Sequence, residues 1–160
     1  CFARSSTQQI IMKFCLALLS LFFAVVVADH GDHSDYVVKT GEDLARYRDQ
    51  CVAKLSIPAD LVEKYKKWEY PDDEKSRCYL KCVLESFGLF DDAKGFDVHK
   101  VHHQLGGGDV DHSNELHGKI ENCAKEGDAA GEDACTRAYR GALCFFKENL
   151  ALVKQNVASK

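Results

Sequence analysis

The 160-residue sequence has little proline and methionine: two prolines and a single Met, at position 12. Few β-branched residues follow position 40, so a sandwich of many short strands is not expected. The formal charge of -4 and the lack of a separate Lys/Arg cluster exclude a generally basic nucleic-acid binder. With 46% hydrophobic and 29% charged residues, the chain has the composition of a single globular domain.

The first part of the chain has the pattern of a secretory signal peptide. Met12-Lys13 precedes fifteen uncharged residues, 14–28, and an acidic, polar segment begins at Asp29. This pattern is typical of a cleaved signal, and fifteen residues are few for a membrane span of about 20. We expect no stable membrane insertion and a secreted, extracellular protein with these parts: upstream translated sequence at 1–11, a signal peptide at 12–28 and one domain at 29–160.

Removal of the signal region changes both the charge and the cysteine count. Without Arg4 and Lys13 the formal net charge falls from -4 to -6, and without Cys1 and Cys15 the cysteines fall from eight to six. An even number of cysteines in a small secreted domain implies three disulfides. The remaining cysteines are Cys51, Cys78, Cys82, Cys123, Cys135 and Cys144.

Hydrophobic residues recur at helical spacing throughout the domain, which predicts an all-α fold of six to seven helices. Thr40 with Asp43 has the pattern of a capping box, and Gly88 is the expected stop of the third helix. No segment alternates well enough to predict a strand. The expected helices start after Thr40, at Pro58, after Pro71, at Val98 (to Leu105), after Ser113 and near Glu132, and 148–157 forms a seventh helix or an ordered tail.

The cysteines lie within this helical pattern. Six cysteines allow fifteen pairings. Because Cys78 and Cys82 lie four apart on one helical face, their side chains run roughly parallel and are poorly placed to bond to each other. Twelve pairings remain, and in all of them the third helix is linked twice to other parts of the chain.

The successive cysteine gaps are 26, 3, 40, 11 and 8 residues. This order resembles the six-cysteine signature of insect odorant-binding proteins, the pheromone/general odorant-binding family, in which the gaps of 3 and 8 are the most diagnostic. The resemblance covers essentially all of 40–150. It implies helices around an internal hydrophobic cavity and three interlocked disulfides: Cys51–Cys82, Cys78–Cys135 and Cys123–Cys144.

The same resemblance implies a carrier of small hydrophobic ligands, odorants or pheromones, that crosses aqueous fluid to an olfactory receptor. Such a site needs apolar side chains around a void and few polar groups. Each candidate also fits an ordinary core. The candidates lie on apolar helix faces near the regions that border the family's cavity: Leu61, Tyr65, Trp68, Phe87, Leu116, Ile120, Tyr139, Phe145 and Phe146.

Histidines are concentrated in the second half of the domain. His99, His102 and His103 share one predicted helix, and His112 and His117 follow. Three interpretations stay open: a zinc site, a pH-dependent switch for ligand release, and solvated surface residues. We favour no metal site and expect no cofactor.

The sequence contains none of the following common catalytic motifs: a nucleophile elbow, a zinc-protease motif or a phosphate-binding loop. The sequence lacks G-x-S-x-G, H-E-x-x-H and a P-loop. The acidic loop 91–97 lacks EF-hand spacing, and a thiol nucleophile is excluded if all six cysteines form disulfides. We therefore expect no enzyme and no catalytic residue. The alternatives are a carrier in haemolymph, saliva or reproductive fluid and a secreted defence or interaction protein; in each case we expect a monomer or weak homodimer.

Overall fold

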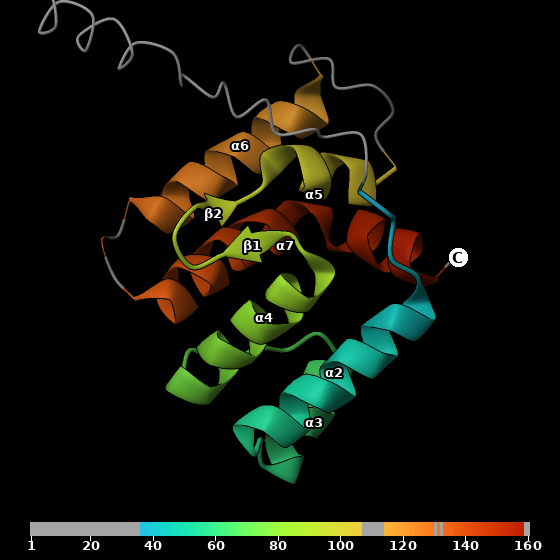
Figure 1. Ribbon diagram of the computed structural model, residues 1–160, viewed down its shortest axis with the longest axis vertical. Coiled ribbons are helices and arrows are strands. Elements are labelled where there is room, and N and C mark those ends of the chain that lie inside the picture. The colour runs from blue at the N-terminus through green and yellow to red at the C-terminus, as the bar shows by residue number, and fades with distance from the viewer. Residues whose placement is uncertain (1–35, 107–113, 130, 132, 159–160) are drawn as a thin grey trace, which may run out of the picture. The chain divides into compact units, whose positions relative to one another are not determined.

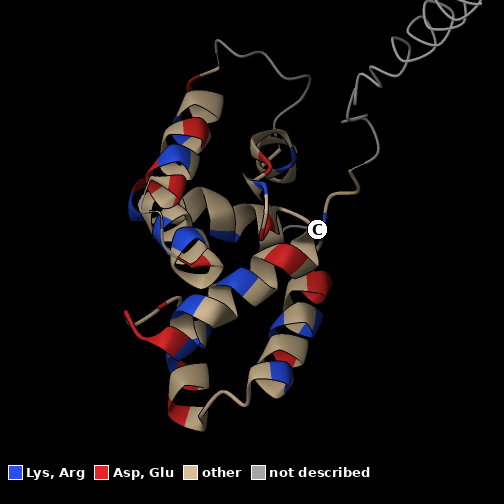
Figure 2. Cartoon of the chain, turned by 60° about the vertical axis from the view of Figure 1, so that its left-hand side comes forward, with Lys and Arg blue, Asp and Glu red and all other residues tan. Residues whose placement is uncertain are grey.

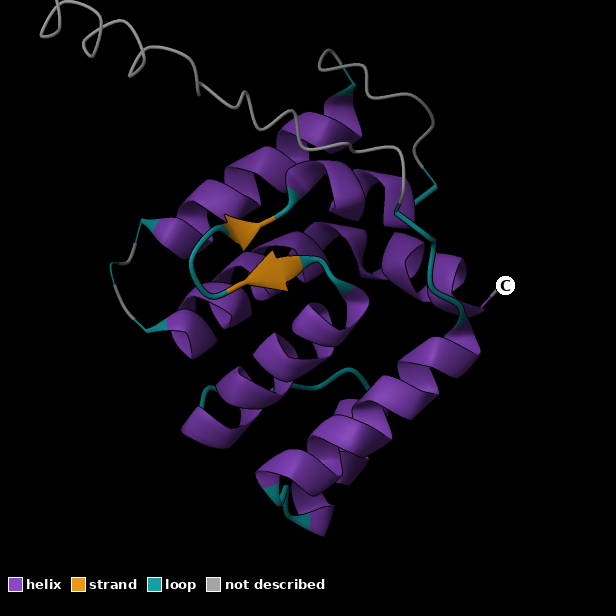
Figure 3. Cartoon of the chain, viewed as in Figure 1, coloured by secondary structure: helices purple, strands orange, loops and turns teal. Residues whose placement is uncertain are grey.

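The computed structural model describes residues 36–106, 114–129, 131 and 133–158. In this part of the chain there are six helices and a hairpin of two-residue strands (Figure 1, Figure 3). The predicted pieces 1–11 and 12–28, and the start of the domain up to residue 35, lie outside the described residues. The elements are α2 (Gly41–Leu55), α3 (Ala59–Lys66), α4 (Glu74–Phe87), β1 (Phe90–Asp91), β2 (Gly95–Phe96), α5 (Val98–Gln104), α6 (Glu115–Asp128) and α7 (Ala134–Ala158).

Two helix ends follow the sequence signals closely. The Asp43 amide donates to the Thr40 hydroxyl at 3.2 Å, and the Thr40 amide donates to the Asp43 carboxylate at 2.9 Å. This reciprocal capping box satisfies two amides that have no partner inside α2. At the end of α4, Gly88 has φ +75°, a left-handed conformation that glycine adopts without steric strain. The predicted start of the first helix and stop of the third are therefore confirmed.

Other boundaries differ from the sequence prediction. Pro58 caps α3 from outside instead of occupying its first turn. Trp68 lies beyond the end of α3 with φ +64°, not on the helix face. α6 starts after Asn114, whose side chain accepts from the Leu116 amide at 2.8 Å, whereas the expected cap, Ser113, lies outside the described residues.

The expectation of no strand was wrong for one short hairpin. Phe90 pairs with Phe96 in antiparallel register, and the Asp91 carboxylate accepts from the amides of Ala93 and Lys94. Two-residue strands are too short to show the alternation on which strand prediction depends. The turn chemistry of Asp91 and Gly95 (φ +76°) was the available signal.

The segment 148–157 continues α7 as a helix. The backbone of Asn149 is non-helical (φ -121°, ψ 16°), and the helix bends there. The Asn149 side-chain amide donates to the Phe145 carbonyl at 3.2 Å, which gives that carbonyl a partner beside the bend. The bend therefore divides α7 into a part before Asn149 and a part after it.

Three disulfides link the helices. Cys51–Cys82 joins α2 to α4, Cys78–Cys135 joins α4 to α7, and Cys123–Cys144 joins α6 to α7. These are the three pairs that the family resemblance implies. With sequence separations of 31, 57 and 21, each link stabilises the fold by about 3–4 kcal/mol in the loop-entropy model.

α6 and α7 pack closely because glycines face each other at their crossing. A Cβ atom added at Gly127 would lie 2.7 Å from the Arg137 carbonyl oxygen, and one at Gly141 would lie 2.5 Å from the Phe96 ring. These distances leave no room for a methyl group. Glycine at both positions thus lets the backbones approach and sets the place of α7 between α6 and α4 (Figure 1).

Candidate functional site

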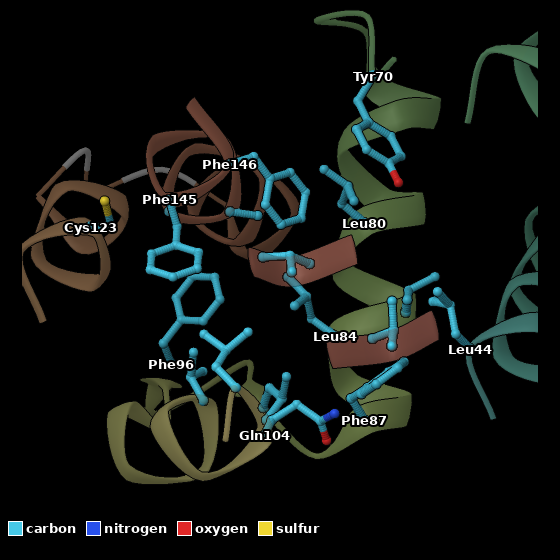
Figure 4. A pocket seen from close by; sticks show the side chains of 18 of the residues that line it. Leu44, Tyr70, Leu80, Leu84, Phe87, Phe96, Gln104, Cys123, Phe145 and Phe146 are labelled. Carbon is cyan, nitrogen blue, oxygen red and sulfur yellow. The ribbon is translucent and has the colours of Figure 1, made fainter. Parts of the chain in front are cut away.

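An apolar pocket of about 110 Å³ lies among α2, α4, α5, α6 and α7. α4 contributes Leu80, Leu84 and Phe87, which recur at i, i+4 and i+7 and therefore share one helical face. From the other side, Phe96 and Phe145 point toward the same space (Figure 4). A dry apolar cavity of roughly 150 Å³ is known to take up a benzene ring, so the pocket as it stands is somewhat smaller than a cavity that holds one aromatic ring.

Five of the nine predicted ligand-binding residues lie in the lining of this pocket. They are Trp68, Phe87, Ile120, Phe145 and Phe146. The Trp68 ring meets the Phe146 ring edge-on with centroids 5.8 Å apart. The last two residues of this group come from α7, the helix that the sequence predicts to begin near Glu132.

The other four predicted residues lie beside the lining. The Tyr65 ring stacks on Tyr79 at 4.2 Å between centroids, and its hydroxyl shares a 2.8 Å hydrogen bond with the Ser76 hydroxyl. The Tyr139 hydroxyl donates to the Tyr70 carbonyl at 2.9 Å. These partners hold both rings between helices. Leu61 and Leu116 are half-buried and pack against two clusters of buried side chains.

Sequence reasoning missed the polar side chains of the lining. Arg48, Tyr70, Tyr79 and Gln104 all line the pocket. Arg48 lies four residues after the apolar Leu44, so helical periodicity carried the signal that both face inward. A charged residue on a mostly polar helix is ordinarily expected to face solvent, and for this reason the sequence did not indicate Arg48 as a lining residue.

The polar groups near α2 form a small donor cluster. Arg48 Nη2 donates to the Tyr70 hydroxyl oxygen at 3.3 Å, and its guanidinium lies over the Trp68 ring, 4.7 Å from the centroid. Burial raises the pKa of Tyr70, an effect that Arg48 partly opposes, and burial likewise raises the pKa of Tyr79. Both phenols are therefore neutral near pH 7 and keep their protons as donors.

Gln104 fixes α5 to the segment that precedes α2. Its side-chain oxygen accepts from the Tyr36 hydroxyl at 2.7 Å and from the Lys39 amide at 2.8 Å, while its nitrogen donates to the Lys39 carbonyl at 2.9 Å. The side chain is 3% exposed. These bonds make Gln104 a structural part of the wall, because its oxygen is already committed to two donors.

Three of the four described histidines, His99, His102 and His117, meet between α5 and α6. The His117 ring lies 5.3 Å from His99 and 5.7 Å from His102, centroid to centroid. His102 is 1% exposed, and burial, followed by the neighbouring His117 and His103, lowers its pKa. The interpretation as solvated surface is wrong for His102 and His117, which are buried. His112 lies outside the described residues.

No group of three metal-ligating side chains occurs within 36–106, 114–129, 131 and 133–158. In the same residues, no helix has the length and apolar character needed to cross a membrane. The rings of His99, His102 and His117 form a packed cluster.

The second part of α7 reaches the pocket. Val153 and Val157 both line it, and Val157 is 9% exposed. The C-terminal part of α7 thus approaches α2 and α4, from which Leu44 and Phe87 line the same pocket (Figure 1). The sequence left the position of the tail beyond Val153 open, and the structure shows Val157 as part of the wall.

Disulfide-linked helices around an apolar pocket define a class of small helical ligand-binding proteins. A family model described as the PBP/GOBP family matches residues 33–148. The chain therefore belongs to the insect pheromone/general odorant-binding protein family, as the cysteine gaps indicated.

Known proteins agree with this assignment over nearly the whole chain. General odorant-binding protein 99b of Drosophila melanogaster is 50% identical over 149 residues, which cover 91% of this chain and 99% of the relative. Odorant-binding protein 22 of Aedes aegypti is 40% identical over 139 residues, 87% of this chain and 98% of the relative. Among solved structures, Anopheles gambiae odorant-binding protein 22a has a TM-score of 0.56 at 25% identity, covering 66% of this chain and 98% of that one.

Proposed function

We propose that this protein is a secreted carrier that holds a small hydrophobic molecule in the pocket and transports it through aqueous fluid to a receptor. The observation that carries the proposal is the composition of the pocket wall, which is almost entirely apolar. Burial of apolar ligand surface yields about 25 cal/mol per Å². A ligand that buries roughly 200 Å² would thus gain about 5 kcal/mol before the entropic cost of binding.

The pocket wall also supports a non-catalytic role. It contains no Ser, Thr, His, Asp, Glu or Lys among the described lining residues, and Cys123 is bonded to Cys144. A nucleophile with an adjacent base is the usual requirement for covalent catalysis. This wall supplies neither, which favours carriage of an unchanged ligand.

Uptake of a fluorescent naphthylamine probe by delipidated protein tests the proposal. We expect saturable binding of one probe per chain and displacement by apolar competitors. Leu84→Trp adds bulk to a half-buried lining position and should lower probe affinity about tenfold or more, because the ring occupies the ligand's space. Val37→Trp, at a side chain that is 70% exposed, is the matched control and should bind as the wild type does.

A folded wild-type protein that takes up no probe would contradict the carrier proposal, provided that circular dichroism shows native helix content. Olfactory carriage is separated from carriage in haemolymph, saliva or reproductive fluid by transcript levels in antennae and other tissues. Enrichment in antennae supports delivery to an olfactory receptor, and absence from antennae contradicts it.

A further inference from the structure

Trp68 lines the pocket from a connection between two helices. α3 ends at Lys66 and α4 begins at Glu74, so Trp68 belongs to neither. It is half-buried and at the same time part of the pocket lining, which places its ring between the pocket and the solvent. It is also the single tryptophan of the chain, so its fluorescence reports on this place alone.

The backbone of Trp68 has an unfavourable conformation. Its φ of +64° lies in the left-handed region, where the Cβ atom of an L-residue crowds the neighbouring carbonyl oxygen. Among the described residues of the pocket lining, Trp68 is the only one with a positive φ. Its inward position is therefore maintained by contacts of the ring that compensate for backbone strain.

Two basic side chains from distant parts of the chain supply such contacts. Arg48 of α2 lies 4.7 Å from the Trp68 ring centroid, and Lys154 of α7 lies 5.9 Å from it. Lys and Arg elsewhere are interspersed with acidic side chains along the helices (Figure 2), and Lys81 with Glu85 at 2.8 Å is one of several ion pairs. Within the described residues, no carboxylate lies within ion-pair distance of Arg48 or Lys154. Both cations are thus left to attract the indole ring.

The size of the pocket requires a part of its lining to move. Its volume is about 110 Å³, whereas a cavity that takes up one benzene ring has roughly 150 Å³. Phe87 and Phe145 are buried within α4 and α7, two helices that a disulfide joins. Trp68 combines partial exposure, a place outside the helices and a strained backbone. Outward movement of its ring would enlarge the pocket without displacing a helix.

We propose that Trp68 is a plug: its ring fills part of the ligand space, Arg48 and Lys154 hold it there, and an entering ligand displaces it toward the solvent. The cation–π contacts favour the inward position and the backbone strain opposes it, so the two positions of the ring differ little in free energy. A ligand that binds only with the ring outward shifts the population to that position. The inference rests on the proposed carrier function and concerns how the same pocket admits its ligand.

Acrylamide quenching of Trp68 fluorescence tests the plug directly, because acrylamide reaches an indole ring in proportion to its exposure. Cyclooctanol is a suitable ligand, since this saturated ring alcohol neither absorbs nor emits where tryptophan does. We expect saturating cyclooctanol to raise the quenching constant about twofold or more and to move the emission maximum to longer wavelength.

The same titration contains the contrary outcomes. An unchanged or smaller quenching constant, while cyclooctanol displaces the naphthylamine probe, would overturn the plug and leave the carrier proposal intact. Failure of both the probe and cyclooctanol to bind to folded protein would overturn both proposals.

Lys154→Gln tests the hold on the ring, because Lys154 contacts Trp68 and is not among the described lining residues. We expect the affinity for cyclooctanol to rise about two- to fivefold through faster association. The dissociation rate should stay unchanged, because the ring is already outward in the complex. Lys39→Gln is the matched control: Lys39 lies 5.8 Å from the Tyr36 centroid, a ring outside the described lining, and the variant should bind as the wild type does. Lower affinity of Lys154→Gln, or equal acceleration of both rates, would contradict the proposal.

Trp68→Ala separates a plug from an ordinary wall residue. Without the ring no displacement is needed, so the affinity should rise at least as much as in Lys154→Gln. Adding Lys154→Gln to Trp68→Ala should then change nothing further, because the two residues act through one contact. Weaker binding by Trp68→Ala with native helix content would show that the ring is a ligand contact and that the proposal is wrong. If Trp68→Ala unfolds the protein, the quenching measurement and Lys154→Gln decide between the outcomes.

Discussion

The two sides of the pocket are held by different interactions. α4 and α7 are joined directly by Cys78–Cys135 and linked onward to α2 and α6 by the other two disulfides. α5 has seven residues, and it is held by Gln104 hydrogen bonds and by contact of His99 and His102 with α6. A covalently linked wall therefore faces a short helix that only packing and hydrogen bonds retain, and we expect the α5 side to open at lower free energy.

The largest effect should follow removal of the link between α4 and α7. Cys78→Ser combined with Cys135→Ser is expected to lower the free energy of unfolding by about 4 kcal/mol, because the unfolded chain regains the freedom of a 57-residue separation. Denaturant titration of both proteins measures the change. A decrease in the free energy of unfolding of less than about 1 kcal/mol would show that the disulfide is not the main interaction holding α4 and α7 together.

The close crossing of α6 and α7 offers a second test on the rigid side. Gly127→Ala should destabilise the protein by about 1–3 kcal/mol, since the added methyl would meet the Arg137 backbone. Gly118→Ala in the same helix is the matched control, because no atom lies within 4 Å of its added Cβ. The control should gain up to about 1 kcal/mol from helix propensity, and equal effects of both changes would contradict the packing argument.

Gln104→Leu tests how α5 is retained. It removes one side chain that forms hydrogen bonds with both Tyr36 and Lys39. We therefore expect the free energy of unfolding to fall by about 1–3 kcal/mol and amide hydrogen exchange near residues 36–40 to become faster. Exchange in α4 should change less. The control is Gln50→Leu, an exposed glutamine on α2, which should leave exchange near residue 39 unchanged.

The smallest effect is expected from pH at His102. Because the folded protein lowers its pKa, the unfolded chain binds a proton first, and stability declines as the pH falls through the ordinary histidine value of about 6.5 toward the lower folded value. Above that window the stabilisation is fully present. The neighbouring titratable groups are His117 on α6 and His99 and His103 on α5.

The free energy of unfolding measured between pH 7 and pH 5 tests whether stability falls as the pH is lowered. His102→Leu should flatten the decline, whereas His103→Leu, at an exposed position, should retain it. A steeper fall in stability between pH 7 and pH 5 in His102→Leu would contradict the assignment of this pH dependence to His102. Ligand affinity at pH 7 and pH 5 in a variant with His102→Ala and His103→Ala asks a separate question: an unchanged pH dependence removes these two residues from any release switch.

The cysteine gaps and caps predicted much of the fold because each is a local or fixed-spacing signal. Thr40 with Asp43 and Gly88 determine helix ends within a few residues, so the sequence alone located them. The pairing of Cys51 with Cys82 was not deducible from spacing, since it depends on how distant helices pack, and only the family resemblance supplied it.

The pocket was predictable in its apolar residues and not in its polar ones. Phe145 and Phe146 lie in the most apolar segment of the domain, and simple periodicity identified them. Trp68 reached the pocket from a backbone turn that no periodicity describes. Arg48 and Lys154 both lie near the Trp68 ring only because α2 and α7 approach it in space, although the two residues are more than a hundred positions apart in the sequence.

The central claim is that ligand occupies the space between these two unlike walls. Isotope-edited NMR of the protein with the bound naphthylamine probe tests it most directly, through contacts between probe protons and side-chain methyl groups. We predict contacts to Leu84 on α4 and Val153 on α7 and also to Val101 on α5 and Ile120 on α6, all of which line the pocket. Saturable binding without contacts to these methyl groups would contradict the account.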